Sequence, residues 1–329
     1  MPQKAITIAT DFSGLDCPVT ALQKMGVPYK HIFSCDNDSH CKKQILANHS
    51  PICFFDDIKD TKTRFDHFPP KGKIDIYVSG IPCQAYSGLS ERQTLEIKNT
   101  KIQGNTDLIK HVLVTIRRLQ PKVCIFENVP LFEKEADYTK LMKAMKRYRY
   151  DTYSDILNSK DYGIPQLRRR IYIVCISKST KKKSATFVYP PVHSEKCKNI
   201  KAIANMKSTN TTCDVPLNET YTMFLLQNKE KIKDLCFINL CSATRHNMCP
   251  ADKKNIGCLT TNCAGIYNLV QNRYATVDEL LTLQGFDPKK FKQVVTNRQV
   301  TKQIGNSMTV NVLEAIFRSI FDYVLFENT

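Results

Sequence analysis

The first 36 residues carry the pattern that most restricts the fold. Residues 5–10 (AITIAT) form an apolar run rich in β-branched side chains, and a polar turn, a helix-forming segment (PVTALQKMG) and a second apolar run ending at Asp36 follow it. This order predicts a strand, a turn, a helix and a second, parallel strand. Asp16 suits the N-cap of the helix, Pro18 its first turn, and Gly26 the position just beyond its end. The sequence therefore predicts an α/β fold.

A carboxylate follows the second predicted strand at a spacing typical of nucleotide-binding sheets. Asp36 lies 22 residues after Gly14. At this distance a carboxylate on the second strand can meet the ribose hydroxyls of a nucleotide held over the first turn. The turn has one glycine rather than the G-x-G-x-x-G pattern, so hydride transfer with a nicotinamide dinucleotide is disfavoured.

Two further apolar runs predict strands that end in polar or reactive residues. Residues 53–55 precede Asp57, and residues 73–79 (KIDIYVS) lead directly into the segment GIPCQAYS. A cysteine just past a strand end and fixed by a proline lies where open α/β sheets carry their reactive groups. Cys83 is therefore the candidate nucleophile. A packed, unreactive thiol is the default for the other thirteen of the fourteen cysteines.

Four short motifs together resemble those of the DNA (cytosine-5)-methyltransferase family. They are GIPCQAYS (80–87), FENV (126–129), QLRRR (166–170) and GNS (305–307), and they occur in the family's order. The resemblance extends from Phe12 to about Val312. It implies an α/β, Rossmann-like mixed sheet with helices on both faces, as in S-adenosylmethionine-dependent methyltransferases, plus a small irregular target-recognition domain.

The composition along the chain predicts a catalytic domain that is interrupted by a second domain. A lysine-rich break at residues 178–183 precedes a long stretch of poor periodicity. We expect a catalytic domain over 1–185, a target-recognition domain over 186–272, and a return segment over 273–329 that completes the catalytic domain. In the return segment, residues 276–284 predict a capped helix, and residues 303–325 predict a turn followed by a long helix with one apolar face.

The chemistry of methylating cytosine explains the residue types of the motifs. Carbon 5 of the ring becomes nucleophilic only after a nucleophile adds at carbon 6, and a thiolate both adds and leaves well. The resemblance assigns this thiolate to Cys83, the donor to ring nitrogen 3 to Glu127, and the base-pocket arginines to Arg168 and Arg170. The apolar surroundings of Glu127 favour its protonated form. Alternation predicts that the two arginines project from the same side of a strand.

S-adenosylmethionine is the cofactor that the resemblance implies. The residues that it places around the cofactor are Phe12, Ser13, Gly14, Asp36, Asn37, Asp57, Ile58, Pro82, Leu108 and Asn306. Two features depart from the family pattern. The usual acidic residue before the turn aligns with Thr10 or, with a shift of one residue, with Asp11. The glycines that normally follow Phe-x-Gly are Asp16 and Cys17, whose side chains we expect to crowd the turn beneath the cofactor.

The charge of the chain favours a polyanionic partner. Its 48 lysines and arginines against 31 acidic residues give a net charge of +17, which suits nucleic acid first and an anionic membrane surface second; a lysine-rich genome with no polyanion involved is the alternative. The resemblance implies double-stranded DNA, and Thr260, Thr261 and Asn262 resemble a family element beside the target base. The lysines that are candidate phosphate contacts are Lys196, Lys198, Lys201, Lys229, Lys231, Lys233, Lys253 and Lys254.

The cysteine pattern favours buried free thiols over disulfides or a metal site. The cysteines are scattered, without a C-x-x-C pair, and no apolar run reaches the ~18 residues of a membrane-spanning helix. We therefore expect an intracellular protein without a membrane partner, in the cytoplasm or, in a eukaryote, the nucleus. Residues 235–243 (LCFINLCSA) predict a strand. The set Cys236, Cys241, His246 and Cys249 does not have a usual zinc spacing, so we expect no metal.

The sequence leaves three hypotheses for the function open. The first is a monomeric enzyme that flips cytosine out of duplex DNA, because the thiol and the cofactor cannot both reach a stacked base. The second keeps the fold and methylates tRNA, although the Cys-Phe-Thr signature of that branch is not seen. The third is a catalytically silent DNA-binding homologue, motivated by the missing turn glycines. The joint presence of Cys83, Glu127, Arg168 and Arg170 disfavours the third.

Overall fold

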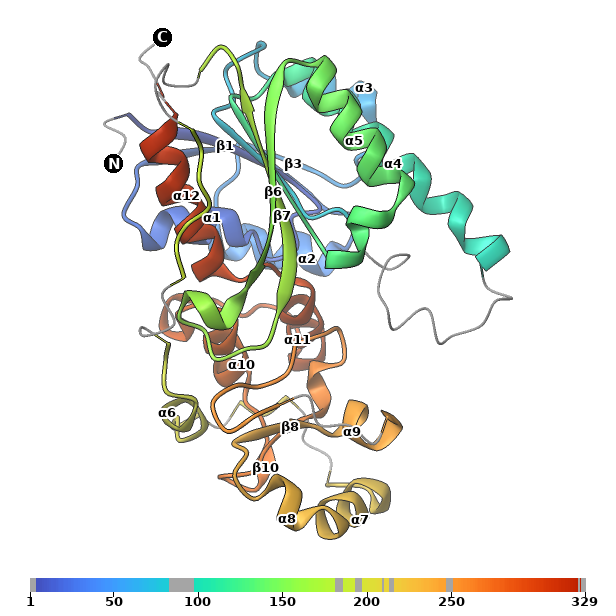
Figure 1. Cartoon of the computed structure of the whole chain (residues 1–329), viewed down its shortest axis with the longest axis vertical. Coiled ribbons are helices and arrows are strands. Elements are labelled where there is room, and N and C mark those ends of the chain that lie inside the picture. Colours follow the sequence, from blue (N-terminus) through green and yellow to red (C-terminus); the bar gives the residue numbers. More distant parts are fainter. Residues whose placement is uncertain are drawn as a thin grey trace. The chain divides into compact units, whose positions relative to one another are not determined.

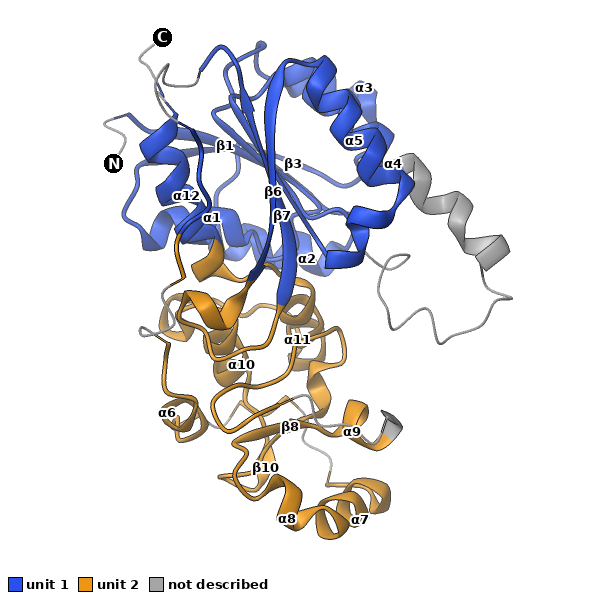
Figure 2. Ribbon diagram, in the orientation of Figure 1, with its two compact units in different colours: residues 1–157, 169–190, 313–329 blue, residues 158–168, 191–312 orange. Residues whose placement is uncertain are grey.

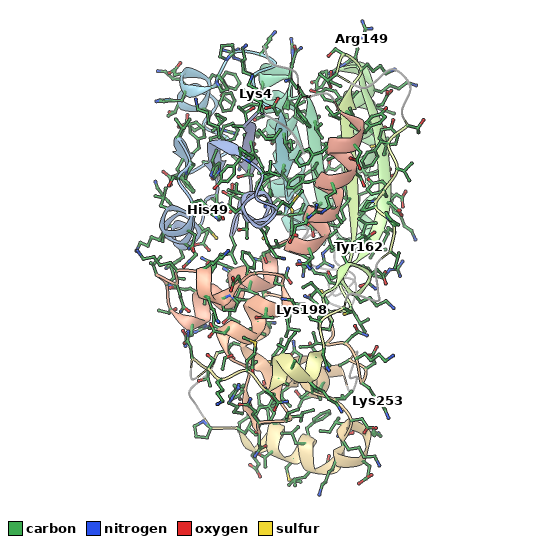
Figure 3. The ribbon with its side chains drawn as sticks, turned by 90° about the vertical axis from the view of Figure 1, so that its left-hand side faces the viewer. Lys4, His49, Arg149, Tyr162, Lys198 and Lys253 are labelled. Atoms are coloured by element: carbon green, nitrogen blue, oxygen red, sulfur yellow. The ribbon has the colours of Figure 1, made fainter. Side chains whose placement is uncertain are left out.

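The chain forms two compact units, each built from separate stretches of sequence (Figure 2). A computed structural model describes residues 4–82, 98–180, 186–192, 197–208, 210–212, 216–246, 251–324 and 326. Unit 1 comprises residues 1–157, 169–190 and 313–329, and unit 2 comprises residues 158–168 and 191–312. The chain therefore passes between the units four times.

Unit 1 is built around a seven-stranded sheet with the order β3-β2-β1-β4-β5-β7-β6 (Figure 1). The strands are β1 (Ile6–Asp11), β2 (Tyr29–Cys35), β3 (Cys53–Phe55), β4 (Ile76–Ser79), β5 (Val123–Asn128), β6 (Tyr150–Asn158) and β7 (Arg169–Ser177). Strands β1 to β5 pair in parallel, whereas β7 pairs with β5 antiparallel. The predicted mixed α/β sheet is confirmed. The parallel strands bring the residues that follow them to one edge of the sheet.

Helices cover both faces of this sheet. They are α1 (Cys17–Lys24), α2 (Ser39–Asn48), α3 (Thr61–His67), α4 (Lys98–Leu119), α5 (Ala136–Arg147) and α12 (Val310–Tyr323). Figure 1 shows α1 and α12 on one side of the sheet, and α4 and α5 on the other. Ile109, Val112 and Ile116 lie three or four residues apart on α4, and they share a buried core with Tyr77 of β4 and Phe126 of β5. This spacing explains which face of α4 is buried.

Unit 2 contains a small antiparallel sheet and several short helices. The sheet has the order β10-β9-β8, with β8 (Phe237–Asn239), β9 (Ile266–Asn268) and β10 (Arg273–Tyr274). The helices are α6 (Ile200–Ala204), α7 (Glu219–Gln227), α8 (Lys229–Ile232), α9 (Leu240–His246), α10 (Val277–Leu283) and α11 (Asn297–Asn306). A separate small core, to which Ile238, Leu240 and Tyr267 belong, stabilises this sheet.

Some predicted elements are confirmed and others need correction. The capping box of Thr276 and Glu279 at the start of α10 is present. The predicted strand over 235–243 is wrong in its second half, because β8 ends at Asn239 and Leu240 begins α9. The predicted turn at Gly305 is displaced, because Gly305 belongs to the last turn of α11.

The boundary of the returning segment also differs from the prediction. The sequence places the return at residue 273, whereas in the structure residues 273–312 belong to unit 2 and only 313–329 return to unit 1. The reason is the packing of α10, whose buried Glu279 accepts hydrogen bonds from Asn268 Nδ2 and Arg273 Nη2, both at 2.8 Å. These contacts fix α10 to the small sheet. None of the helices within the described part of the chain is long and apolar enough to cross a membrane.

Candidate active site

The turn between β1 and α1 has an unusual backbone. We call residues 12–16 the cofactor turn, since the sequence places the cofactor there. Phe12, Gly14 and Asp16 all have left-handed backbone angles, with φ of 54°, 56° and 54°. Glycine adopts this conformation freely, whereas a non-glycine residue in it is uncommon. The position of a Cβ atom on Gly14 would face open space, with no atom within 4 Å. The turn therefore leaves room for a ligand to approach its backbone.

Asp36 reaches the cofactor turn from the end of β2. Its Oδ2 atom accepts a hydrogen bond from Gly14 N at 2.8 Å, and its Oδ1 atom accepts one from Asp38 N at 3.0 Å. Burial raises the pKa of the Asp36 carboxyl group, while these two backbone donors oppose the rise. Asp36 is only half-buried. Its carboxylate oxygens each retain a lone pair for a further donor.

The other predicted cofactor residues differ in their surroundings. Asn37 and Asp57 are exposed, Leu108 and Pro82 are half-buried, and Ile58 is buried. The Asp57 carboxylate already accepts a hydrogen bond from Lys59 N at 2.9 Å. Asn306 is exposed at the end of α11 and belongs to unit 2. In unit 1, Asn37, Asp57 and Ile58, and Pro82 thus follow the carboxyl ends of β2, β3 and β4, whereas Leu108 lies within α4.

Asp11, one of the two candidates for the family's acidic position, forms a buried ion pair. Its carboxylate lies 2.6 Å from Arg64 Nη2 and accepts a hydrogen bond from Tyr77 Oη at 2.7 Å. The side chains of Arg64 and Asp11 are 1% and 0% exposed. The Arg64 guanidinium also lies 5.2–5.6 Å from the ring centres of Phe33, Phe55 and Phe68. The Asp11 carboxylate therefore already has an ion-pair partner and a hydrogen-bond donor within the protein. No pattern in the sequence indicated Arg64.

Glu127 and Arg170 face each other across the pairing of β5 with β7. Arg170 Nε lies 3.3 Å from Glu127 Oε1, and Glu127 is 8% exposed. The geometry falls short of a hydrogen bond, and Oε1 has no hydrogen-bond partner among the described residues. Arg170 Nη1 donates to the carbonyl of Arg169 at 2.7 Å. The carboxyl group is thus paired electrostatically with Arg170, while its Oε1 atom is left without a hydrogen bond from the described residues.

Arg168 has a different environment from Arg170. The exposure of Arg169 between the buried Arg168 and the half-buried Arg170 agrees with the predicted alternation, but Arg168 lies just before β7, which begins at Arg169, and belongs to unit 2. Its guanidinium is 3% exposed and donates to the carbonyls of Leu259 at 2.7 Å, Gly305 at 3.2 Å and Ser307 at 2.7 Å. Arg168 thus joins two segments of unit 2 that are distant in the sequence.

The predicted nucleophile Cys83 lies outside the described residues, which stop at Pro82 and resume at Lys98. The chain just before it is tied to the neighbouring strand, because Asn128 Nδ2 donates to the carbonyl of Ile81 at 3.3 Å. Asn128 ends β5, next to Glu127. The segment that leads to Cys83 is therefore held beside the Glu127 end of β5.

Gly305 allows α11 to pack closely against the segment 260–262. A Cβ atom at this position would lie 1.8 Å from the carbonyl oxygen of Thr260. We expect Gly305→Ala to lower the free energy of unfolding by about 1–3 kcal/mol, the usual cost of inserting an atom into a packed region. Chemical denaturation of the variant measures this loss. Lys302→Ala, an exposed position on the same helix, is the control, and equal stability of the two variants would contradict the close packing.

Comparison with known proteins identifies the family of the chain. Residues 10–322 match the family model of the C-5 cytosine-specific DNA methylases. The chain belongs to this family. It is similar to the type II methyltransferase M.HpaII of Haemophilus parainfluenzae, with 29% identity over 94% of this chain and 88% of that protein. It is also similar to M.NgoBI of Neisseria gonorrhoeae, with 27% identity over 92% of this chain and 89% of that protein.

Solved structures show the same fold. The S. pombe Dnmt2 methyltransferase superimposes with a TM-score of 0.67 at 15% identity, over 96% of this chain and 98% of that one. The Entamoeba histolytica methyltransferase EhMeth superimposes with a TM-score of 0.64 at 18% identity, over 97% of this chain and 99% of that one. Membership of the family makes the chain a DNA cytosine-5 methyltransferase, and S-adenosylmethionine is its cofactor.

Proposed function

We propose that this methylase acts on cytosine in double-stranded DNA through a covalent adduct with Cys83. The thiolate adds to ring carbon 6, and the electron pair moves to carbon 5, which takes the methyl group. Loss of the carbon 5 proton then expels the thiolate and restores the aromatic ring. The cofactor supplies an electrophilic methyl group on sulfur when it is bound. Because the thiol and the methyl group must approach the ring from opposite faces, the base has to leave the duplex stack.

The buried Glu127 carboxyl group, whose Oε1 atom is ion-paired with Arg170 but accepts no hydrogen bond from the described residues, is the observation that carries this proposal. The atom is buried and has no hydrogen-bond partner among the described residues. It lies at the end of β5, beside the strand exit that leads to Cys83. A carboxyl group there can donate a hydrogen bond to ring nitrogen 3, where negative charge accumulates when the thiolate adds to the ring. Arg170 Nε, 3.3 Å away, keeps the carboxyl group in place, and its guanidinium offers donors to the carbonyl oxygen of the base.

The residues around the cofactor turn fit S-adenosylmethionine. Gly14 leaves open space above the turn, and the half-buried Asp36 presents lone pairs that suit ribose hydroxyls. We propose that the remaining side chains line the same site. They are Phe12, Ser13, Asn37, Asp57, Ile58, Pro82 and Leu108, all in unit 1.

We propose that unit 2 contacts the DNA and that Arg168 supports it from within. The Arg168 guanidinium is committed to three backbone carbonyls, so it orders the segment containing Thr260 rather than touching the base. Exposed lysines of unit 2, such as Lys201, Lys229 and Lys231, are suited to phosphate contacts. We propose that the protein acts as a monomer, and light scattering of the protein with a short duplex tests this.

Methyl transfer to competing nucleic acids tests the proposed function. The protein is incubated with isotopically labelled S-adenosylmethionine, mixed-sequence duplex DNA and tRNA, and the nucleosides are analysed. We expect label in 5-methylcytosine of the DNA, with no reduction by added tRNA. Label confined to tRNA would establish the RNA substrate instead. Binding of the duplex without any label would establish a silent DNA-binding protein.

The role of Glu127 predicts a specific defect in a conservative variant. Glu127→Gln keeps the size of the side chain but removes its acidic proton. We expect kcat to fall by about 10²–10⁴-fold, the usual contribution of a positioned acid or base. Calorimetry should show unchanged affinity for S-adenosylmethionine. Glu133→Gln, at an exposed position in the 3₁₀ helix Pro130–Lys134, is the matched control. If Glu127→Gln retains at least half of the wild-type kcat, the assigned role is incorrect.

A further inference from the structure

The cofactor turn contains a buried carboxylate at a position where the family pattern has glycine. Asp16 is 0% exposed. Its Oδ1 atom accepts a hydrogen bond from Thr10 Oγ1 at 2.9 Å, and its Oδ2 atom accepts one from Ser34 Oγ at 2.6 Å. The next residue, Cys17, is 2% exposed. Both side chains are therefore buried within unit 1, and the expectation that they crowd the turn beneath the cofactor stays a prediction.

Two chains of hydrogen bonds converge on the Asp16 carboxylate. In the first, Thr10 gives its only hydroxyl proton to Asp16, so Ser13 is the donor in the 2.8 Å contact between Ser13 Oγ and Thr10 Oγ1. This contact is shorter than those from Ser13 Oγ to the carbonyls of Cys35 and Thr10, at 3.1 and 3.2 Å. Cys35 N in turn donates to Ser13 Oγ at 2.9 Å. Every donor in this chain points toward the carboxylate.

The second chain runs along β2. Ser34 gives its hydroxyl proton to Asp16, so His31 Nε2 is the donor in its 2.9 Å contact with Ser34 Oγ. This arrangement requires the Nε2–H form of His31. Burial lowers the pKa of His31 to about 4, which agrees with a neutral ring. All four side chains that link to Asp16 are buried, with exposed fractions of 0–8%. Donors that converge on one buried acceptor hold it in position.

The backbone explains why such an anchor is needed. Three of the five residues in the cofactor turn have left-handed angles, and only Gly14 adopts them without strain. Non-glycine residues remain in this conformation where the surroundings overdetermine it. Ser13 and Asp16 form hydrogen bonds with residues of β1 and β2. Asp36, which directly follows β2, accepts a hydrogen bond from Gly14 N. The turn is therefore fixed before any ligand binds, which lowers the entropic cost of binding.

We infer that Asp16 is a positioning residue for the cofactor, which holds the cofactor turn in its binding conformation through Thr10, Ser13 and Ser34. This inference rests on the proposed place of S-adenosylmethionine at the turn. It predicts that a glycine at position 16 weakens cofactor binding, although glycine relieves the left-handed backbone. If Asp16 did not hold the turn, glycine at this position would leave cofactor binding unchanged or make it tighter.

Calorimetric titration of the purified full chain with S-adenosylmethionine tests the inference. We expect Asp16→Gly to raise the Kd at least tenfold, while kcat at saturating cofactor changes less than threefold. Asp16→Asn keeps the shape and one acceptor oxygen, so its Kd should lie between those of the wild type and Asp16→Gly. An unchanged or lower Kd for Asp16→Gly would overturn the inference.

Milder variants keep the test valid if Asp16→Gly does not fold. Thr10→Val and Ser34→Ala each remove one donor to Asp16 and leave the carboxylate in place, and we expect each to raise the Kd at least threefold. Thr115→Val, at a buried position on α4, is the matched control and should not change the Kd. If Thr10→Val and Ser34→Ala both bind like the control, the inference fails. If the wild type itself does not bind S-adenosylmethionine, the proposed cofactor site fails instead.

Discussion

Cys83→Ala should reduce methyl transfer by about 10⁴-fold or more, because removal of a catalytic nucleophile eliminates the covalent route. Without addition at carbon 6, carbon 5 of cytosine is not nucleophilic enough to take the methyl group. The variant should still bind S-adenosylmethionine and duplex DNA with wild-type affinity, since a thiol contributes little to either. Label incorporation into 5-methylcytosine, measured over hours, gives the residual rate.

Another thiol provides the control for this experiment. Cys197 is a half-buried free cysteine, so Cys197→Ala removes the same atom without a catalytic role. We expect it to retain wild-type activity. A residual rate for Cys83→Ala above one hundredth of the wild type would contradict the covalent mechanism. Trapping with a duplex that contains 5-fluorocytosine adds a second readout, because the fluorine cannot leave as a proton does. The wild type and Cys197→Ala should form a stable adduct, and Cys83→Ala should form none.

Arg64→Met should lower the free energy of unfolding by about 3–5 kcal/mol, because it leaves the buried Asp11 carboxylate without its cation. Methionine is close to the arginine stem in length and fills the space between the phenylalanine rings. The loss of unfolding free energy therefore reflects the unpaired charge of Asp11 rather than a cavity. Tyr77 Oη remains as the one described donor to Asp11. Denaturant titration, followed by far-ultraviolet circular dichroism, measures the change.

Two further variants separate the contributions to this loss. Asp11→Asn combined with Arg64→Met removes both charges, and we expect it to recover at least half of the lost stability. Lys42→Met breaks the exposed ion pair with Asp56, in which the side chains are 37% and 70% exposed, and should cost less than about 1 kcal/mol. If Arg64→Met is as stable as Lys42→Met, the buried pair does not stabilise the fold.

Local sequence patterns predicted strands β1 to β4 of unit 1 and the turn after β1. The apolar runs at 5–10 and 53–55 correspond to β1 and β3. Gly14 and Asp36, which lie 22 residues apart, are joined by a hydrogen bond of 2.8 Å from Gly14 N to Asp36 Oδ2. Such features depend on a few neighbouring residues and on the regular geometry of a parallel sheet. They are therefore visible in a single sequence.

Features that depend on distant residues were not predictable. Arg64 lies in a polar helix, TKTRFDH, and looks like a surface residue, but its partner Asp11 is 53 positions away. Arg168 was expected to continue a strand, but carbonyls 91 and 139 positions away bind its guanidinium. Asp16 was expected to crowd the turn beneath the cofactor, and its hydrogen bonds with Thr10 and Ser34, on which the inferred positioning role rests, are visible only in the folded chain.

The division of unit 1 into three stretches of chain has a consequence for protein synthesis. The ribosome makes β1 to β7 first, then most of unit 2, and only then α12, whose Ile316, Phe317 and Ile320 are fully buried. At about 5–20 residues per second, the nascent sheet waits several seconds for this helix, with the apolar face that it covers open to water. We therefore expect the catalytic unit to complete its folding late in translation and to depend on chaperones until then.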